Sequence, residues 1–386
     1  MGNIMDIAPA DLDILRRILE SPTAPFHEQA VVDVVVEWAS RQGLSARRDR
    51  WGNVLLDWPG QAGRRVKRAS WCFAAHMDHP GFVLRRVDGP RGRSARRVVA
   101  DFLGGVREEY LVAGGRVVFF DGGRVVKGVI KAMHMPTAGD GQRKAEVFPW
   151  AEIELMSPAD TAWPVGAVGM WDFPAMRVRG DVLSSRACDD LVGCVAVLCA
   201  MRRVVEVRPA HCVTALLTRA EEVGFVGALA ACEAGTVPAG SLVISVETSK
   251  AKAGASPGGG AVVRVGDATR TFDPAVTATV SATAAALAKE DETFAWSRQL
   301  MTGGTCEATA YQARGWRVGA VCLPLVNYHN MGPRGRLAPE RVNLRDFNAV
   351  VKLLTALAGQ EPDPSSSDRR LSRRFDEILA NHRPRL

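Results

Sequence analysis

Residues 211–234 read HCVTALLTRAEEVGFVGALAACEA. The apolar run over 211–217 predicts a buried β-strand, and the small and apolar residues over 228–234 predict a helix. Two glutamates, Glu221 and Glu222, lie between these segments. A strand that runs into charged residues and then into a helix is typical of an α/β sheet, whose ligands bind beyond the carboxyl ends of the strands.

The same alternation of helix and strand continues on both sides of this stretch. We expect helices over residues 11–19, 27–42, 189–204, 283–292 and 343–358, and strands over 44–48, 53–57, 70–75, 242–246 and 316–322. This pattern predicts an α/β fold with a doubly wound sheet, in which helices cover both faces.

The segment between residues 85 and 167 has a different character. Its short β-rich pieces are separated by glycine-containing turns, and no convincing long helix occurs among them. The β-rich pieces cover 98–103, 116–120, 125–132 and 151–155. We therefore expect an all-β domain, 85–167, inserted into a discontinuous α/β domain made of residues 1–84 and 168–360.

The last part of the chain, residues 361–386, is expected to form a linker and a basic tail. Residues 361–368 read EPDPSSSD, a composition typical of a linker. A helix rich in arginine is expected over 369–380.

Composition and charge limit the class of protein. The chain has 386 residues, of which 47% are hydrophobic and 24% charged, and this balance is ordinary for a soluble globular protein. It excludes a disordered chain, a collagen-like rod and a small disulfide-rich protein. A net charge of +7 permits nucleic-acid binding, but no recognition motif accompanies it, so we predict no nucleic-acid partner.

The cysteines and the apolar runs bear on the compartment. None of the eight cysteines forms a CxxC motif, and most lie in apolar segments, so we expect reduced thiols and a cytoplasmic protein. The first 13 residues hold three acids and no base, unlike a signal peptide. The longest glycine-free apolar stretch, 194–201, is far shorter than the roughly 20 residues of a membrane span, so no membrane partner is expected.

Several polar residues interrupt apolar segments near the predicted strand ends. They are His76, Asp78, Asp189, Asp190, Glu221, Glu222, Glu247 and His329. Each has an ordinary structural explanation on its own, such as a helix cap or a loop hydrogen bond. Together, unpaired charges beside buried strands would be costly, and divalent cations would relieve that cost. Histidine and carboxylate ligands suit Zn²⁺, Mn²⁺ or Co²⁺.

The order of the motifs HMDxxGF, CDDxVG, AEEVGFVGA, VETS and YHN resembles that of the dinuclear metallo-aminopeptidases of the glutamyl-aminopeptidase and tetrahedral-aminopeptidase family. The resemblance runs from about residue 15 to 357 and includes SPTAPFHEQAV, DRWGNV and GGTCEA. It implies an α/β domain with a central mixed sheet and a barrel-like all-β insertion. The insertion expected from the turns falls in that place.

The resemblance also implies a site with two divalent metal ions, zinc in the first place and cobalt or manganese as alternatives. Asp189 would bridge both ions. His76 and Glu247 would complete one coordination sphere, and Glu222 and His329 the other.

Further roles are carried over from the same resemblance. Asp78 would accept a hydrogen bond from His76 and so orient it. Glu221 would be the general base that takes a proton from water activated by the metal ions and passes it to the leaving amine. The peptide bond between Asp189 and Asp190 would be cis.

The chain departs from the family pattern at several positions. A glutamate usually follows HxD, where this chain has His79, and the residue at 247 is frequently Asp. The usual GGTDA reads GGTCEA over 303–308, and we assign Gly304, Thr305 and Glu307 to substrate binding. His79 and His134 are either accessory groups of the site or surface or loop histidines, and we favour the second interpretation.

We therefore predict a metal-dependent aminopeptidase that acts on short peptides and forms a homo-oligomer through the insertion. A related dinuclear deacylase or carboxypeptidase acting on N-acyl substrates is the alternative within hydrolases. A catalytically silent binding protein on the same fold is a third hypothesis, against which the complete ligand set argues.

Overall fold

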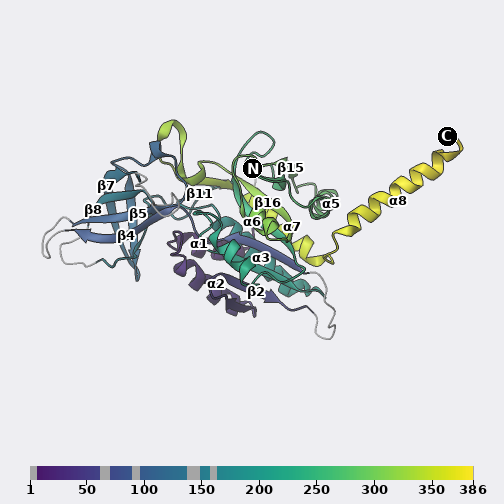
Figure 1. Cartoon of the computed structure of the whole chain (residues 1–386), viewed down its shortest axis with the longest axis horizontal. Helices are drawn as coiled ribbons and strands as arrows, with labels where there is room; N and C mark the ends of the chain where they lie inside the picture. The colour runs from purple at the N-terminus through teal and green to yellow at the C-terminus, as the bar shows by residue number, and fades with distance from the viewer. Residues whose placement is uncertain (1–6, 61–69, 89–95, 137–147, 157–162, 386) are drawn as a thin grey trace.

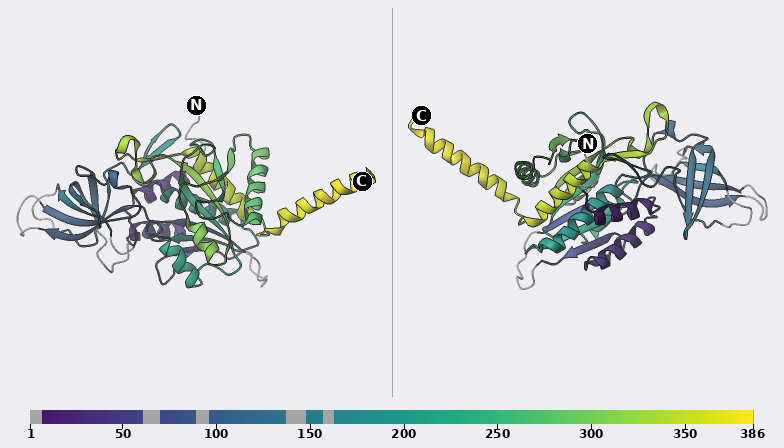
Figure 2. Two further views of the ribbon diagram at one scale, coloured as in Figure 1. Left: turned by 45° about the horizontal axis from the view of Figure 1, so that its top comes forward. Right: turned by 180° about the vertical axis from the view of Figure 1, so that it is seen from behind.

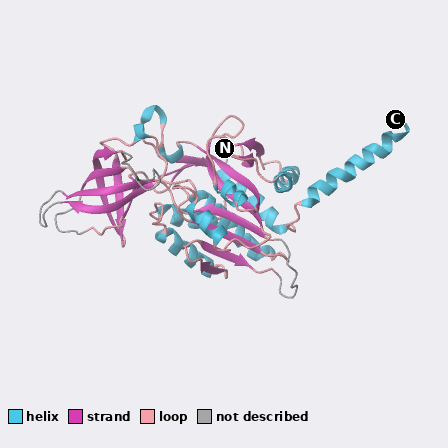
Figure 3. Ribbon diagram, in the orientation of Figure 1, coloured by secondary structure: helices cyan, strands magenta, loops and turns pink. Residues whose placement is uncertain are grey.

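A sheet covered by helices forms the body of the molecule, and a barrel of strands lies beside it (Figures 1 and 3). The computed structural model describes residues 7–60, 70–88, 96–136, 148–156 and 163–385. Within this part of the chain, no helix is both long and apolar enough to cross a membrane.

The central sheet has eight strands. Their order is β1 (Ser45–Arg48), β2 (Val54–Trp58), β12 (Val213–Thr218), β3 (Trp71–His76), β13 (Leu242–Lys250), β16 (Arg317–Leu325), β14 (Ala261–Gly266) and β15 (Trp296–Leu300). Strands β12, β3, β13 and β16 are mutually parallel, whereas β2 and β14 run antiparallel to them on either side. The sheet is therefore mixed, as the resemblance implies.

Helices pack on both faces of this sheet because alternate residues of a strand point to opposite faces. Along β3, Trp71, Phe73 and Ala75 lie in one core, while Cys72 and Ala74 lie in a second. The first core holds α1 (Pro9–Glu20), α2 (Gln29–Arg41), α3 (Leu191–Val207), α5 (Pro274–Glu290) and α7 (Leu344–Gly359). The second holds α4 (Val226–Glu233) and α6 (Glu307–Ala313). The doubly wound α/β fold is confirmed.

The second unit is a closed six-stranded barrel. Its order is β4 (Gly81–Asp88), β5 (Arg96–Leu103), β8 (Trp150–Leu155), β7 (Arg124–His134), β6 (Arg116–Asp121) and β9 (Val168–Trp171). The ring of Phe82 lies in the barrel interior, and its centroid is 4.9 Å from the ring centroid of Phe102 and 5.0 Å from that of Trp171. The closing pair joins β4 to β9, so the barrel reaches beyond residues 85 and 167 at both ends.

A small sheet and short helices complete the chain. The sheet contains β10 (Arg177–Arg179), β11 (Val182–Ser185) and β17 (Glu340–Asn343). The 3-10 turns are η2 (Glu108–Tyr110), η4 (Tyr328–Asn330), η5 (Pro333–Gly335) and η6 (Arg383–Arg385). A last helix, α8 (Ser365–His382), projects from the body in every view (Figure 2).

Some element boundaries differ from the sequence prediction. The prediction that residues 361–368 form a linker is wrong for the second half of this segment, because α8 begins at Ser365, directly after Pro364. Helix α5 begins at Pro274, well before the expected 283, and the carboxylate of Asp273 caps it by accepting from the N–H groups of Ala275 and Val276.

Candidate active site

The predicted ligands converge because parallel strands end at a common edge of the sheet. His76 is the last residue of β3 and pairs with Thr218, the last residue of β12, after which the chain turns into Glu221 and Glu222. Ser245 of β13 pairs with Ala74 of β3, so Glu247 lies level with His76. Asp189 precedes α3, and His329 lies in η4, after β16.

Asp189 lies between two groups of candidate ligands. Its Oδ1 is 3.5 Å from Nε2 of His76, and its Oδ2 is 3.6 Å from Nε2 of His329. Nε2 of His76 is also 3.9 Å from Oε2 of Glu247, and Nε2 of His329 is 3.0 Å from Oε1 of Glu222. Each of these two groups offers ligand atoms within 4.8 Å of one another, and both contain Asp189. A third group that meets the same limit consists of His76, Glu221 and Glu222.

Hydrogen bonds leave the Nε2 atoms of both histidines free to bind a cation. Nδ1 of His76 donates to the backbone carbonyl of Asp78 at 3.1 Å, and Nδ1 of His329 donates to the carbonyl of Gly105 at 2.5 Å. With the proton on Nδ1, the lone pair of each ring lies on Nε2, facing the carboxylates.

The donor set fits divalent cations. Oε1 of Glu222 and Nε2 of His329 are buried and have no hydrogen-bond partner among the described residues. Burying two acceptor atoms side by side with no proton between them costs free energy, unless a cation binds to both. Imidazole and carboxylate ligands are those that zinc, cobalt and manganese accept.

The crowding of carboxylates shifts their pKa values. Burial raises the pKa of Glu247 to about 7 and, together with Glu247 and Glu222, raises the pKa of Glu221 well above its ordinary value. Burial would also raise the pKa of Asp189, but the neighbouring imidazoles of His329 and His76 outweigh it and hold that pKa below the usual range. Divalent cations would therefore compete with protons for the carboxylates of this cluster.

Asp78 holds the loop that carries both glutamates. Its Oδ1 accepts from the N–H of Glu221 at 2.9 Å, and its Oδ2 accepts from the N–H of Glu222 at 3.0 Å. The same Oδ1 is 3.5 Å from Nδ1 of His76, farther than the carbonyl of Asp78 itself. The carboxylate of Asp78 therefore holds the backbone of Glu221 and Glu222 at least as directly as it orients the ring of His76.

Glu340, at the start of β17, is a buried residue of the site that the sequence analysis missed. Its Oε2 accepts from the N–H groups of Cys188 at 2.6 Å and Asp189 at 3.1 Å, and its Oε1 accepts from the N–H of His329 at 2.7 Å. It therefore ties together the segments that carry Asp189 and His329. It lies between Pro339 and Arg341 and interrupts no long apolar run, so the sequence pattern did not mark it.

The two histidines of uncertain role lie in different places. His79 lies in the loop after β3, as expected, but not at the surface: its ring is buried, Nδ1 donates to the carbonyl of Asp189 at 2.6 Å, and Nε2 is 3.2 Å from Oδ1 of Asn330. His134 lies in the barrel, stacked on Trp150. The peptide bond between Asp189 and Asp190 is cis, as predicted.

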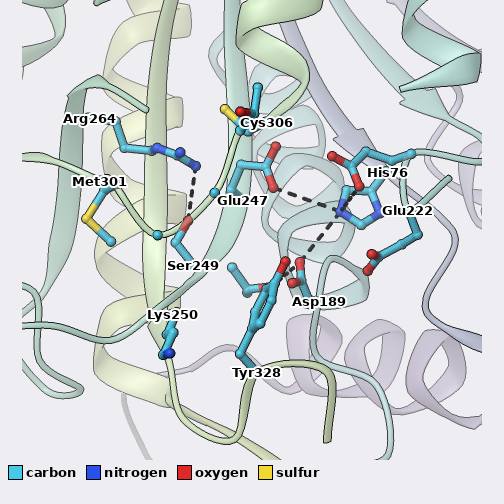
Figure 4. Close-up of a pocket in the computed structure, with 15 residues that line it drawn as sticks. His76, Asp189, Glu222, Glu247, Ser249, Lys250, Arg264, Met301, Cys306 and Tyr328 are labelled. Atoms are coloured by element: carbon cyan, nitrogen blue, oxygen red, sulfur yellow. Dashed lines mark hydrogen bonds and ion pairs between the residues drawn. The ribbon is translucent and has the colours of Figure 1, made fainter. Parts of the chain in front are cut away.

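A cavity opens beside the ligand cluster (Figure 4). Its wall contains Gly304 and Thr305, two of the residues assigned to substrate binding. The third, Glu307, is fully buried at the start of α6 and is not part of this wall. Its carboxylate accepts from the hydroxyl of Thr218 at 2.7 Å, so its side chain points into the second core.

Arg264 of β14 faces the same cavity. Only 3% of this residue is exposed, and Nη1 donates to Oγ of Ser249 at 3.0 Å. Figure 4 shows it on the far side of Glu247 from His76. Within the described part of the chain, no carboxylate oxygen lies within 4.0 Å of its guanidinium nitrogens. The cavity thus has an anionic side, at the ligand cluster, and a cationic side.

Comparison with known proteins gives concordant results. Residues 52–353 match the family model described as M42 glutamyl aminopeptidase. The chain is 32% identical over 79 residues to the cytosol non-specific dipeptidase of Escherichia coli K12 and 26% identical over 192 residues to the putative aminopeptidase SgcX of the same strain. These matches cover 20% and 48% of this chain, and only 16% and 49% of those relatives.

A solved structure has the same fold over nearly its whole length. The TET1 peptidase of Pyrococcus horikoshii, described as assembling into a tetrahedron or a large octahedral shell, superposes with a TM-score of 0.69 at 20% identity. The superposition covers 90% of this chain and 99% of that one.

Proposed function

Because the chain belongs to the M42 glutamyl aminopeptidase family, we propose that it is a metal-dependent aminopeptidase that removes N-terminal residues from short peptides. The observation that carries the proposal is the position of Asp189, whose two carboxylate oxygens face two separate groups of ligands. One carboxylate shared in this way is the arrangement that a pair of cations requires.

Five side chains would hold the ions. His76 and Glu247 would bind one, Glu222 and His329 the other, and Asp189 both. Bound divalent ions, with zinc first and cobalt or manganese as alternatives, would lower the pKa of water and polarise the scissile carbonyl. Asp78 and Glu340 hold the backbone of these ligands in place through the N–H bonds described above.

Glu221 is the carboxylate that remains for proton transfer. Glu221 also belongs to a third possible group, with His76 and Glu222, but both groups built on Asp189 are complete without it. It lines the cavity, with Oε2 3.9 Å from Nε2 of His76. A carboxylate there can take a proton from the attacking water and give it to the leaving amine. Its loop is held by Asp78, so the base keeps its orientation.

Arg264 suggests which N-terminal residue is preferred. Glu247 and Asp267 help to raise the pKa of Arg264 in spite of its burial, but Nε of the guanidinium has no hydrogen-bond partner among the described residues. A ligand that brings its own carboxylate could accept hydrogen bonds from this guanidinium. We therefore expect a preference for peptides whose first residue is acidic.

The proposal also covers the cellular location and the oligomeric state of the protein. We expect a cytoplasmic homo-oligomer. Support comes from eight cysteines that are all unpaired and from the TET1 peptidase, which is described as forming closed shells. The all-β barrel, expected as residues 85–167, is the part that we assign to self-association.

Metal removal and a substrate panel test the proposal. The chelator-treated protein should not hydrolyse aminoacyl anilides, and Zn²⁺, Co²⁺ or Mn²⁺ should restore hydrolysis. N-acetylated versions of the same substrates should not be cleaved. Turnover by protein verified to be metal-free, or preference for the acetylated series, would contradict the proposal and would favour a metal-independent hydrolase or a deacylase, respectively.

A further inference from the structure

Helix α8 carries an exposed apolar stripe. Its members are Leu371, Phe375, Ile378 and Leu379, which are 48%, 57%, 46% and 45% exposed. Their spacing of four, three and one residues places them on one face of the helix. A continuous apolar stripe on an otherwise polar helix is typical of a surface that packs against a partner.

The body of the molecule leaves this stripe uncovered. Helix α8 meets the body near α5 and then runs away from it, as all views show (Figures 1 and 2). It lies beyond residue 353, where the match to the family model ends. A lone helix of 18 residues is marginally stable in water without such packing.

Three of the four residues of the stripe are arranged symmetrically about Phe375. Leu371 and Leu379 lie four residues before and after it. When two such helices pack antiparallel with Phe375 against its own copy, Leu371 of each helix therefore lies level with Leu379 of the other. Phe375 and both leucines then face apolar side chains, whereas Ile378 lies level with Ser372 of the other helix.

The order of charges favours the antiparallel arrangement over the parallel one. Arg373 and Arg374 precede Phe375, whereas Asp376 and Glu377 follow it. An antiparallel pair places the basic half of one helix beside the acidic half of the other, while a parallel pair places like charges together.

We propose that α8 is a self-association element, which pairs antiparallel with α8 of a second copy of this chain about a twofold axis at Phe375. The pair would place the two bodies at opposite ends of helices that are about 27 Å long. A pair of single helices is a small interface beside the roughly 1,200–2,000 Å² of a standard stable one, so we expect the pairing alone to depend on protein concentration.

Cross-linking of the full-length chain tests the register. Leu371→Cys and Leu379→Cys are made separately in a Cys212→Ser background, because Cys212 is the exposed one of the native cysteines. After mild oxidation, a mixture of the two variants should form the 371–379 disulfide in clear excess over 371–371. Ala380→Cys, on the opposite face, is the control. A yield no higher than that of the control, or a dominant 371–371 product, would overturn the proposal.

A second pair of variants tests the stripe itself. Phe375→Glu should weaken association through α8 at least about tenfold in the dissociation constant, because it puts a charge at the centre of the interface. Ala380→Glu introduces the same residue on the other face and should have no effect. The readouts are light-scattering mass and the yield of the 371–379 disulfide.

Two outcomes of these measurements would refute the pairing. One is an unchanged mass and disulfide yield in Phe375→Glu. The other is binding to anionic vesicles that requires Phe375 while no disulfide forms without vesicles. The second result would assign the stripe to membrane binding instead.

Discussion

Replacing Glu340 by glutamine should loosen one half of the site without touching a candidate ligand. The two oxygens of Glu340 accept three backbone N–H bonds, from Cys188 and Asp189 on one side and from His329 on the other. Glutamine has only one acceptor oxygen. The orientation that keeps the first two bonds turns the amide NH₂ group toward the N–H of His329, so that two donors face each other.

The size of the effect follows from that single lost bond. A hydrogen bond to a charged acceptor contributes about 1.5–3 kcal/mol, and a buried N–H left unpaired costs a similar amount. The segment of His329 is expected to move in order to relieve this cost, and cation binding has to move it back. At about 1.4 kcal/mol per tenfold, the affinity of the group containing His329 should fall by about 10–100-fold.

Competition against a fluorescent zinc chelator measures this affinity. The titration is best made at about pH 8.5, since burial and the neighbouring Asp189 raise the pKa of Glu340 to about 8. Asp346→Asn is the matched control, because Asp346 is a buried carboxylate that accepts from the N–H groups of Gly258 and Gly260, away from the ligands. Wild-type affinity in Glu340→Gln, or an equal loss in the control, would refute the reasoning.

The other predictions concern the chemistry of the site. Glu221→Gln should lower kcat by about 10²–10⁴-fold with metal content unchanged, whereas Glu222→Gln should lower metal content; equal metal loss in both would contradict their separate roles. Arg264→Met should lower kcat/KM for peptides with an acidic first residue by about tenfold or more while sparing those that begin with leucine, and a uniform loss would count against the preference. Zinc affinity should fall as the pH drops through 7, because burial raises the pKa of Glu247 to about 7 and a proton then occupies this ligand. A zinc affinity that is constant between about pH 5.5 and 8 would exclude Glu247 as a ligand that titrates in this range.

Most of the fold could be predicted because its strands are strongly apolar. Strands β3, β12, β13 and β16 are buried on both faces and read as continuous apolar runs. The edge strand β15, WSRQL, has no such run and was not predicted. The start of α8 was read as linker because serine and aspartate are typical both of linkers and of the first turn of a helix.

The site was predictable where a ligand interrupts an apolar segment, as at His76 and Glu247. Glu307 shows the limit of this reasoning: its motif placed it near the site, but the orientation of α6 turns its carboxylate toward Thr218. Glu340 shows the opposite case, since its role depends on backbone N–H groups of residues 188, 189 and 329, which only the folded chain brings together.

The central claim is that Asp189 is shared by two cations, and the number of ions bound per chain tests it most directly. Metal-stripped protein titrated with Zn²⁺ should bind two ions per chain, and Asp189→Asn should weaken both, because each group of ligands loses the same carboxylate. Thermal unfolding with and without zinc would show that the variant is folded. A single ion in the wild-type protein, or loss of one ion with the other bound at full affinity in Asp189→Asn, would contradict the shared site.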